Sequence, residues 1–206
     1  MSLCIDCGCA FCCDGTLYSR APLKEEDLPI LAGQFDVFQE KNKLEAGKPE
    51  ANFKQPCKLC VNDRCSIHEE KRPAICGDYL CKLVDNHVLG KVSTEAARTL
   101  VENVKKLRDR LRPELENITG AGSEVSFLEL SLLAVSQLEK ERITERTADS
   151  AQTLLDIAMM RILLAKNFDS RLTKHTDLAD KALQAMETAA ESPVRPGVDA
   201  GKLPTQ

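Results

Sequence analysis

The sequence predicts an α-rich protein of mixed α+β class, mostly helical, in which a small irregular metal-stapled N-terminal domain precedes a helical bundle or hairpin array. Two observations support this prediction. All ten cysteines lie between Cys4 and Cys81. From about Ser93 onward, apolar residues recur at helical spacing. We therefore expect three regions: a cysteine-cluster metal-binding domain at residues 1–90, a helical region at 91–191 and a disordered tail at 192–206.

Composition and charge limit the partners that the chain can bind. Of 206 residues, 43% are hydrophobic and 29% are charged, and the formal net charge is −4. Aromatic residues make up only 4%, so base-stacking surfaces are scarce, and there is no basic excess to attract phosphates. We therefore expect no nucleic-acid partner. No apolar run approaches the length of a membrane span, so we expect no membrane partner either.

The N-terminus bears on the state of the cysteines. It reads Met-Ser-Leu-Cys-Ile-Asp and lacks the basic and apolar segments of an export signal. We therefore expect a cytoplasmic location, where thiols stay reduced and disulfides are rare. Cysteine is dense enough in residues 1–81 to suggest a disulfide scaffold if the chain were secreted. Metal ligation is the favoured interpretation, and disulfides are the alternative.

The cysteines fall into two groups along the chain. The first reads Cys4-Ile-Asp-Cys7-Gly-Cys9-Ala-Phe-Cys12-Cys13, and the second comprises Cys57, Cys60, Cys65, Cys76 and Cys81. Sulfur ligands at Cys-x2-Cys spacing suit a structural zinc ion and iron–sulfur clusters alike, so the pattern indicates a soft metal without choosing one. Neighbouring side chains project apart in extended backbone, so Cys12 and Cys13 either bridge two sites or provide one ligand and one packed thiol.

Other residue types are weaker candidates for metal ligands. His68 and His87 could each replace a cysteine, but an ordinary partly exposed histidine is the more frequent case. Three aspartates lie within two residues of a cysteine, where turn residues are expected: Asp14, Asp63 and Asp78.

The cysteines and their neighbours resemble the YkgJ-type cysteine-cluster family, which carries a zinc- or iron-chelating domain. The matching elements are Cys4-x2-Cys7-Gly8, Cys12-Cys13, Cys57, Cys65-Ser66-Ile67-His68-Glu69, Arg72-Pro73-x2-Cys76, Tyr79 and Cys81. The resemblance covers about residues 1–83. It implies eight metal ligands, which are Cys4, Cys7, Cys12, Cys13, Cys57, Cys65, Cys76 and Cys81. Cys9 and Cys60 look like additions to the family pattern, and the long first group leaves open which of Cys7, Cys9 and Cys12 bind.

The resemblance implies a zinc- or iron–sulfur-binding protein whose metal is mainly structural. A relative in the cysteine region, the flagellin lysine methylase, implies the alternative of an iron–sulfur redox protein or enzyme component. The surplus Cys9 and Cys60 would fit a third role, metal delivery or buffering. Outside the cysteines we find no acid–base or nucleophile set, so the sequence leaves open whether the chain is an enzyme. We expect Arg72 to offset thiolate charge or to donate hydrogen bonds to ligand sulfurs.

The segment between the cysteine groups gives weaker signals. Residues 24–31 could form a short helix, and alternating apolar and polar residues at 32–38 predict a strand. The charged residues 41–50 predict an exposed turn. Asn62 and Asp63 mark another turn.

Downstream of residue 90 the sequence predicts three helices and a weaker fourth. We expect this helical region to bind a protein partner or to self-associate. Ser93 is the expected N-cap of the first helix, whose apolar stripe is Leu100, Val104, Leu107 and Leu111. The second helix is expected at 126–143, with the stripe Leu128, Leu132, Val135 and Leu138. The third is expected at 147–168, with the stripe Ala151, Leu154, Leu155, Ala158, Ile162 and Ala165. The fourth is expected at 177–190.

Overall fold

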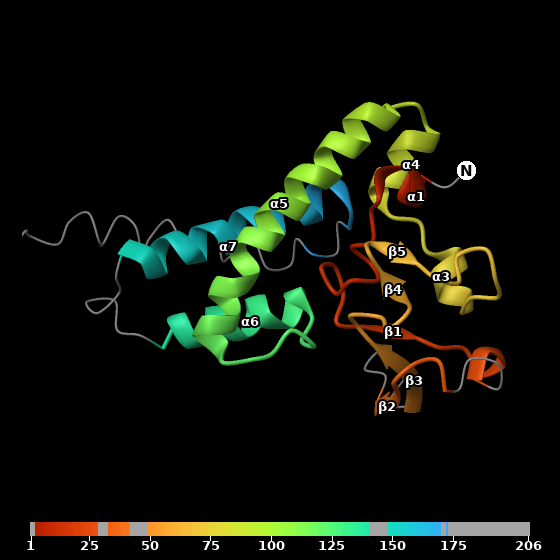
Figure 1. Cartoon of the computed structure of the whole chain (residues 1–206), viewed down its shortest axis with the longest axis horizontal. Coiled ribbons are helices and arrows are strands. Elements are labelled where there is room, and N and C mark those ends of the chain that lie inside the picture. The colour runs from red at the N-terminus through yellow and green to blue at the C-terminus, as the bar shows by residue number, and fades with distance from the viewer. Residues whose placement is uncertain (1–2, 29–32, 42–48, 141–147, 170–171, 173–206) are drawn as a thin grey trace, which may run out of the picture.

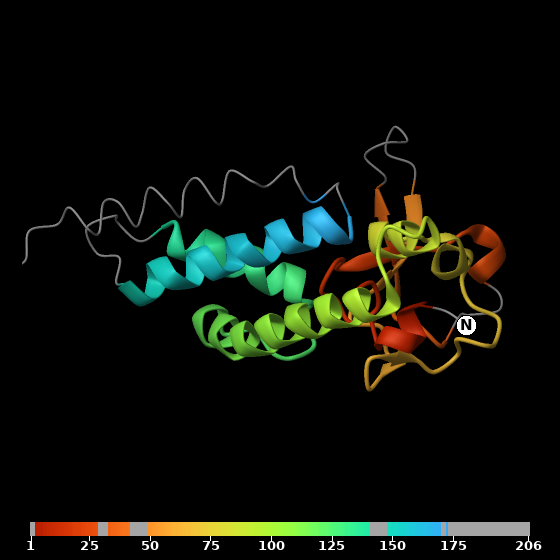
Figure 2. The same cartoon turned by 90° about the horizontal axis from the view of Figure 1, so that it is seen from above.

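The computed structural model describes residues 3–28, 33–41, 49–140, 148–169 and 172. Its elements are α1 (Leu3–Cys7), β1 (Arg20–Pro22), the 3₁₀ helix η1 (Glu25–Asp27), β2 (Val37–Lys41), β3 (Pro49–Lys54), β4 (Cys60–Val61), β5 (Arg64–Cys65), α3 (Ala74–Asp78), α4 (Lys82–Val88), α5 (Thr94–Thr119), α6 (Phe127–Leu138) and α7 (Ala148–Asn167). Helices predominate over two small antiparallel sheets, which confirms the predicted mixed α+β class. Helices α5, α6 and α7 form one lobe, and the strands with α1, α3 and α4 form the other (Figure 1, Figure 2).

The larger sheet has three antiparallel strands in the order β1-β3-β2. The strand expected at 32–38 lies instead at β2, and the turn expected at 41–50 overlaps the start of β3. Three consecutive residues of β3 are buried, from Ala51 to Phe53. Alternation could not reveal this strand, because a strand covered on both faces has no period-two pattern.

The smaller sheet is the hairpin of β4 and β5, which carries two cysteines. Asn62 and Asp63 form its tip with positive φ angles of 50° and 57°. These are the residue types that tolerate the left-handed conformation needed in a two-residue hairpin turn. The predicted turn is confirmed, and it places Cys60 directly opposite Cys65.

Side-chain caps set the starts of the two helices that follow the cysteine region. The Ser93 hydroxyl accepts the Ala96 N–H at 3.1 Å, so α5 begins where the sequence predicts. The Ser126 hydroxyl accepts the Glu129 N–H at 3.1 Å and donates to the Glu129 carboxylate at 3.0 Å, which fixes the start of α6.

The apolar faces of these helices differ partly from the predicted stripes. Leu132 on α6 is 41% exposed and Ile162 on α7 is 43% exposed, so these two assignments to the core are wrong. Helix α6 instead packs through Leu130 and Ala134, both fully buried. On α6 the polar residues Glu129, Ser136 and Gln137 lie on the same exposed face as Leu132, so the predicted stripe is offset from the buried one.

One hydrophobic core runs through both lobes. Phe11 in the first cysteine group and Leu17 just after it join Val101 and Leu111 of α5 in a single buried cluster. Phe168, at the end of α7, meets Phe11 edge-to-face with ring centroids 5.2 Å apart. The core thus crosses the boundary that the sequence suggests near residue 90.

A second, smaller core lies under the three-stranded sheet. Its buried members are Leu23, Phe35, Ala51 and Phe53. The expected helix at 177–190 and the expected tail at 192–206 lie outside the described residues. Among the residues that are described, no helix is long and apolar enough to cross a membrane.

Candidate metal centre

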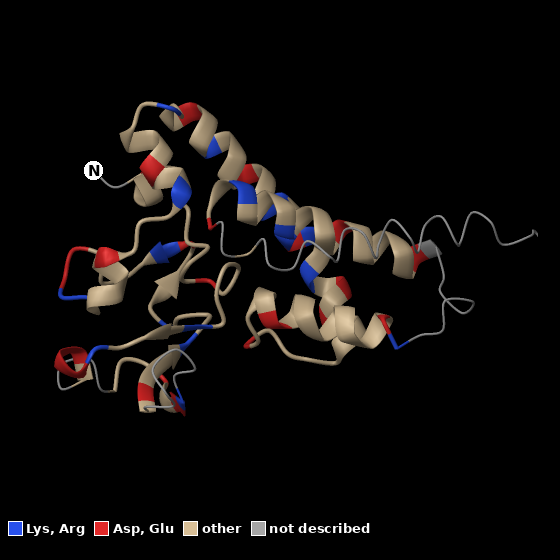
Figure 3. Ribbon diagram, turned by 180° about the vertical axis from the view of Figure 1, so that it is seen from behind, with Lys and Arg blue, Asp and Glu red and all other residues tan. Residues whose placement is uncertain are grey.

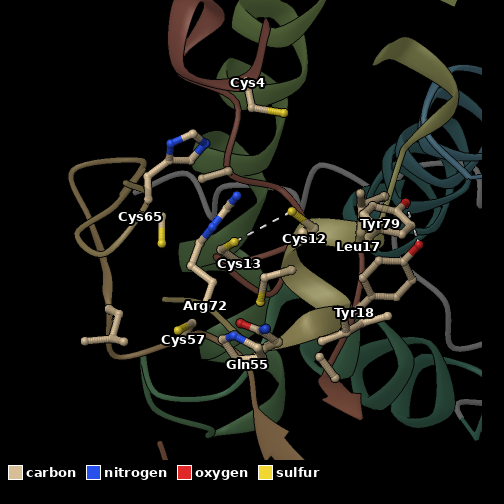
Figure 4. A pocket seen from close by; sticks show the side chains of 18 of the residues that line it. Cys4, Cys12, Cys13, Leu17, Tyr18, Gln55, Cys57, Cys65, Arg72 and Tyr79 are labelled. Atoms are coloured by element: carbon tan, nitrogen blue, oxygen red, sulfur yellow. Dashed lines mark hydrogen bonds between the residues drawn. The ribbon is translucent and has the colours of Figure 1, made fainter. Parts of the chain in front are cut away.

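A cavity of about 440 Å³ opens where the two cysteine groups meet (Figure 4). Eight of the ten cysteines line it, and these are Cys4, Cys9, Cys12, Cys13, Cys57, Cys65, Cys76 and Cys81. All ten cysteines lie in the described part of the chain, and none forms a disulfide. The fold therefore brings residues separated by more than forty positions to one cavity.

Seven of the eight cysteines expected to bind metal line this cavity, and Cys7 does not. Cys7 is buried in the large core on α1, where its thiol faces the Thr94 carbonyl oxygen at 3.9 Å. Cys9, which looks like an addition to the family pattern, lines the cavity instead.

The sulfurs share a cavity but are not yet gathered around one point. No three His, Cys, Asp or Glu side chains of the described residues lie close enough together to hold a metal ion. The Sγ atoms of Cys12 and Cys13 are 3.6 Å apart. The donor type fits zinc or an iron–sulfur cluster. Ligation requires the sulfurs to move inward, to roughly 2.3 Å from a zinc ion.

Burial raises the pKa of several lining thiols. It raises the pKa of Cys57 from 9.0 to about 11 and that of Cys76 to about 12. The pKa of Cys9 is raised mainly by burial as well. The pKa of Cys13 is raised first by its hydrogen bond with Cys12 and then by burial. A metal must therefore displace protons when it binds, and its affinity falls as the pH is lowered.

Charge on other cysteines also raises the pKa of these thiols. After burial and a backbone hydrogen bond, the pKa of Cys9 responds to charge on Cys4 and Cys81. After burial, the pKa of Cys76 responds to charge on three cysteines: Cys13, Cys57 and Cys65.

Arg72 is a basic residue of the cavity lining. It lines the cavity, and its charge favours ionisation of the thiols of Cys13, Cys65 and Cys76. Figure 4 shows its side chain extending among the labelled sulfurs. This position suits the predicted role of offsetting thiolate charge.

Backbone and carboxylate contacts place the second cysteine group. The Cys57 N–H donates to the Cys13 carbonyl oxygen at 2.7 Å, which joins the two groups directly. Asp27 is buried, and its carboxylate accepts the Ala74 N–H at 3.1 Å. An anion at the first turn caps α3, the short helix that carries Cys76.

Helix α5 carries basic residues along its length (Figure 3), and two of them pair with aspartates close to the two cysteine groups. Arg108 donates to the Asp14 carboxylate, which directly follows Cys13, and lies 3.8 Å from Asp63 at the hairpin tip. Lys105 donates to Asp63 at 2.8 Å. Sequence reasoning assigned these aspartates to turns and missed their partners on α5, because long-range pairing leaves no local signal.

Two tyrosines link the cavity to the end of α7. The hydroxyl oxygens of Tyr18 and Tyr79 are 2.7 Å apart, and the Tyr18 hydroxyl donates to the Asp169 carboxylate. Burial, followed by the hydrogen bond to Tyr18, raises the pKa of Tyr79. The Tyr79 hydroxyl therefore stays protonated, and the hydrogen bond from Tyr18 to Asp169 links the cysteine lobe to the end of α7.

Gln55 is a further lining residue that the sequence did not single out. It is 4% exposed, and its Oε1 atom has no hydrogen-bond partner among the described residues. Figure 4 shows its amide pointing into the cavity beside Cys57. A buried amide without a partner points to a group that the cavity receives.

The histidines contribute little to the site. His68 lines the cavity, but its Nδ1 atom is 2.8 Å from the Glu69 carboxylate. His87 is absent from the lining, and its Nδ1 atom is 2.9 Å from the Val92 carbonyl oxygen. These contacts agree with the prediction that both are ordinary histidines.

No family model, curated protein or solved structure matches the chain. The resemblance to the YkgJ-type family therefore remains a prediction that depends on the motif residues.

Proposed function

We propose that this protein binds a soft metal, either zinc or iron in an iron–sulfur cluster, through the cysteines of the cavity, and that the metal is mainly structural. One observation carries the proposal: eight cysteines from two distant groups line one cavity. A single buried cysteine is commonly a packed thiol. Packing gives no reason for eight cysteines to converge, whereas soft-metal ligation does.

The metal would staple a lobe that has little core of its own. The small core under the sheet has only four buried members, and short irregular domains of this kind depend on such staples. Metal binding would draw the sulfurs inward from their present positions. The free energy of binding would then stabilise the fold of the cysteine lobe.

Membership of the YkgJ-type family and a cytoplasmic location belong to the same proposal. They are supported by the ordered motif residues and by the advantage of a reducing compartment for thiolate ligands. A protein partner or a second copy would bind the helical lobe. Leu132 and Leu133 on α6 and Met159 and Ile162 on α7 are exposed apolar residues that fit this role.

The alternative is an iron–sulfur redox protein or enzyme component related to flagellin lysine methylase. Gln55 favours it, because its buried carbonyl oxygen lacks a partner among the described residues. The cavity also extends past the sulfurs to Tyr18, Tyr79 and Phe35. An organic molecule beside the metal would use this space.

Elemental analysis and visible absorption of protein purified without air or chelators test the proposal. We expect zinc, or iron with the broad visible absorption of an iron–sulfur cluster. Cys57→Ser and Cys76→Ser should lose metal, and Cys60→Ser, whose side chain is not part of the lining, should retain it. Protein that contains no bound metal, or whose cysteines form disulfides, contradicts the proposal.

A further inference from the structure

We propose that the cavity holds two metal centres of four cysteines each, with the Cys12-Cys13 doublet divided between them. This inference rests on the proposed function. The helix-side centre comprises Cys4, Cys9, Cys12 and Cys81. The strand-side centre comprises Cys13, Cys57, Cys65 and Cys76. Cys7 and Cys60 are ligands of neither centre.

The two hydrophobic cores divide the cysteines in this way. Cys81 belongs to the large core that contains the helices, and Cys9 and Cys12 pack against it. Cys57 and Cys76 pack against the small core under the sheet. Each core therefore presents its own cysteines to the shared cavity.

Backbone contacts divide them in the same way. On the helix side, the Cys9 N–H donates to the Cys4 carbonyl oxygen at 2.8 Å. On the strand side, the Cys60 N–H donates to the Cys57 carbonyl oxygen at 2.9 Å, and Cys60 lies opposite Cys65. The hairpin therefore holds Cys57 and Cys65 in one region.

The doublet sits at the junction of the two centres. Cys12 packs against the large core, whereas the Cys13 carbonyl oxygen accepts the Cys57 N–H at 2.7 Å. The Sγ atoms of Cys12 and Cys13 are 3.6 Å apart, so the doublet can supply one sulfur to each of two adjacent centres. In Figure 4 the Cys57 and Cys65 sulfurs lie on one side of the Cys13 sulfur, and the Cys12 sulfur lies on the opposite side of it.

Cys7 and Cys60 are left out for separate reasons. Cys7 is buried in the large core and faces the Thr94 carbonyl oxygen rather than the cavity. Cys60 lies opposite Cys65 in the hairpin but is not part of the cavity lining. Four thiolates give each divalent ion a net charge of −2. Arg72 lines the cavity with its side chain among the labelled sulfurs (Figure 4), so its cation would offset part of this charge at the strand-side centre.

Cadmium titration of the full chain tests the assignment, because ¹¹³Cd NMR reports each thiolate site separately. We expect two equivalents of Cd²⁺ and two resonances in the range of tetrathiolate sites. Cys9→Ser should remove or shift only the helix-side resonance, and Cys76→Ser only the strand-side one. Cys65→Ser should reproduce the effect of Cys76→Ser. The matched variants Cys7→Ser and Cys60→Ser should keep both resonances.

The outcomes separate this inference from the proposed function. A wild-type chain that gives no thiolate-bound cadmium resonance overturns both. A single tetrathiolate resonance, or loss of the same resonance in Cys9→Ser and Cys76→Ser, overturns only the two-centre assignment. Loss of a resonance in folded Cys7→Ser or Cys60→Ser also overturns it. Far-ultraviolet circular dichroism identifies a variant that fails to fold, and Cys4→Ser then replaces Cys9→Ser.

Discussion

Removal of the Arg108 charge should loosen the attachment of both cysteine groups to α5. Arg108→Met keeps an apolar side chain of similar reach but removes the guanidinium, which lies 6.0 Å from the Phe11 ring centroid, and so leaves the Asp14 carboxylate without its cation. The two side chains are only 13% and 14% exposed. Breaking a buried pair costs about 3–5 kcal/mol. Asp14 retains the Thr16 N–H at 2.8 Å, so we expect a loss of about 2–4 kcal/mol in the free energy of unfolding.

Urea denaturation of metal-free protein, followed by circular dichroism, measures this loss. Arg98→Met is the matched control, because Arg98 lies on the same helix in an exposed pair with Glu95 at 3.3 Å. Such pairs contribute about 0–1 kcal/mol. Asp14→Asn should recover part of the loss when combined with Arg108→Met, because the stranded charge is gone. If Arg108→Met destabilises the protein no more than Arg98→Met does, the tethering role is refuted.

Three further perturbations address other parts of the site. Gly15→Ala should cost about 1–3 kcal/mol in thermal denaturation, because Gly15 has a φ of 81° and a Cβ there would lie 2.8 Å from the Ser126 side chain. Gly33 also has a positive φ, but a Cβ added there would have no atom within 4 Å. An equal loss of stability in Gly15→Ala and Gly33→Ala would therefore contradict the role of the Ser126 contact. Tyr18→Phe should lower the free energy of unfolding by about 1–3 kcal/mol in urea denaturation, because the buried Asp169 carboxylate loses the donor that Tyr18 provides. An unchanged midpoint would contradict a stabilising role for the Tyr18–Asp169 hydrogen bond. Burial raises the pKa of Cys57 to about 11 and that of Cys76 to about 12, from 9.0 for an exposed thiol. The contribution of these two thiols to the stability of the metal-free protein should therefore be complete below pH 9.0. It should be lost as the pH rises through the two raised pKa values. Urea denaturation across this range should show a slope that Cys76→Ser reduces, and an identical slope in the variant would contradict the assignment.

The sequence predicted those features of the fold that depend only on neighbouring residues. Ser93 predicted the start of α5 because a capping hydroxyl acts within one turn, and Asn62-Asp63 predicted the hairpin tip because few residues tolerate positive φ. Strand β3 was missed because both of its faces are covered. Leu132 was assigned to the core from its spacing to Val135, although it shares an exposed face with the polar Glu129, Ser136 and Gln137.

The candidate site was foreseen to a similar extent. Cysteine content and order predicted seven of the residues that line the cavity. Cys7 was misplaced although a signal existed: it lies four residues after Leu3, and both face the core from α1. Gln55 and Arg108 carried no comparable signal, because their roles depend on contacts with residues far along the chain.

The two cores suggest that metal contributes differently on the two sides of the cavity. The helix-side cysteines pack against a core that includes α5, α6 and α7, so that region has apolar burial to stabilise it without metal. The strand-side cysteines pack against only four buried apolar residues. There, Asp27 and the Arg108 network hold the backbone, but little buried area keeps the hairpin and α3 in place. Loss of metal should therefore unfold the strand side first and leave the helical lobe folded, because only the strand side depends on bound metal for most of its stability.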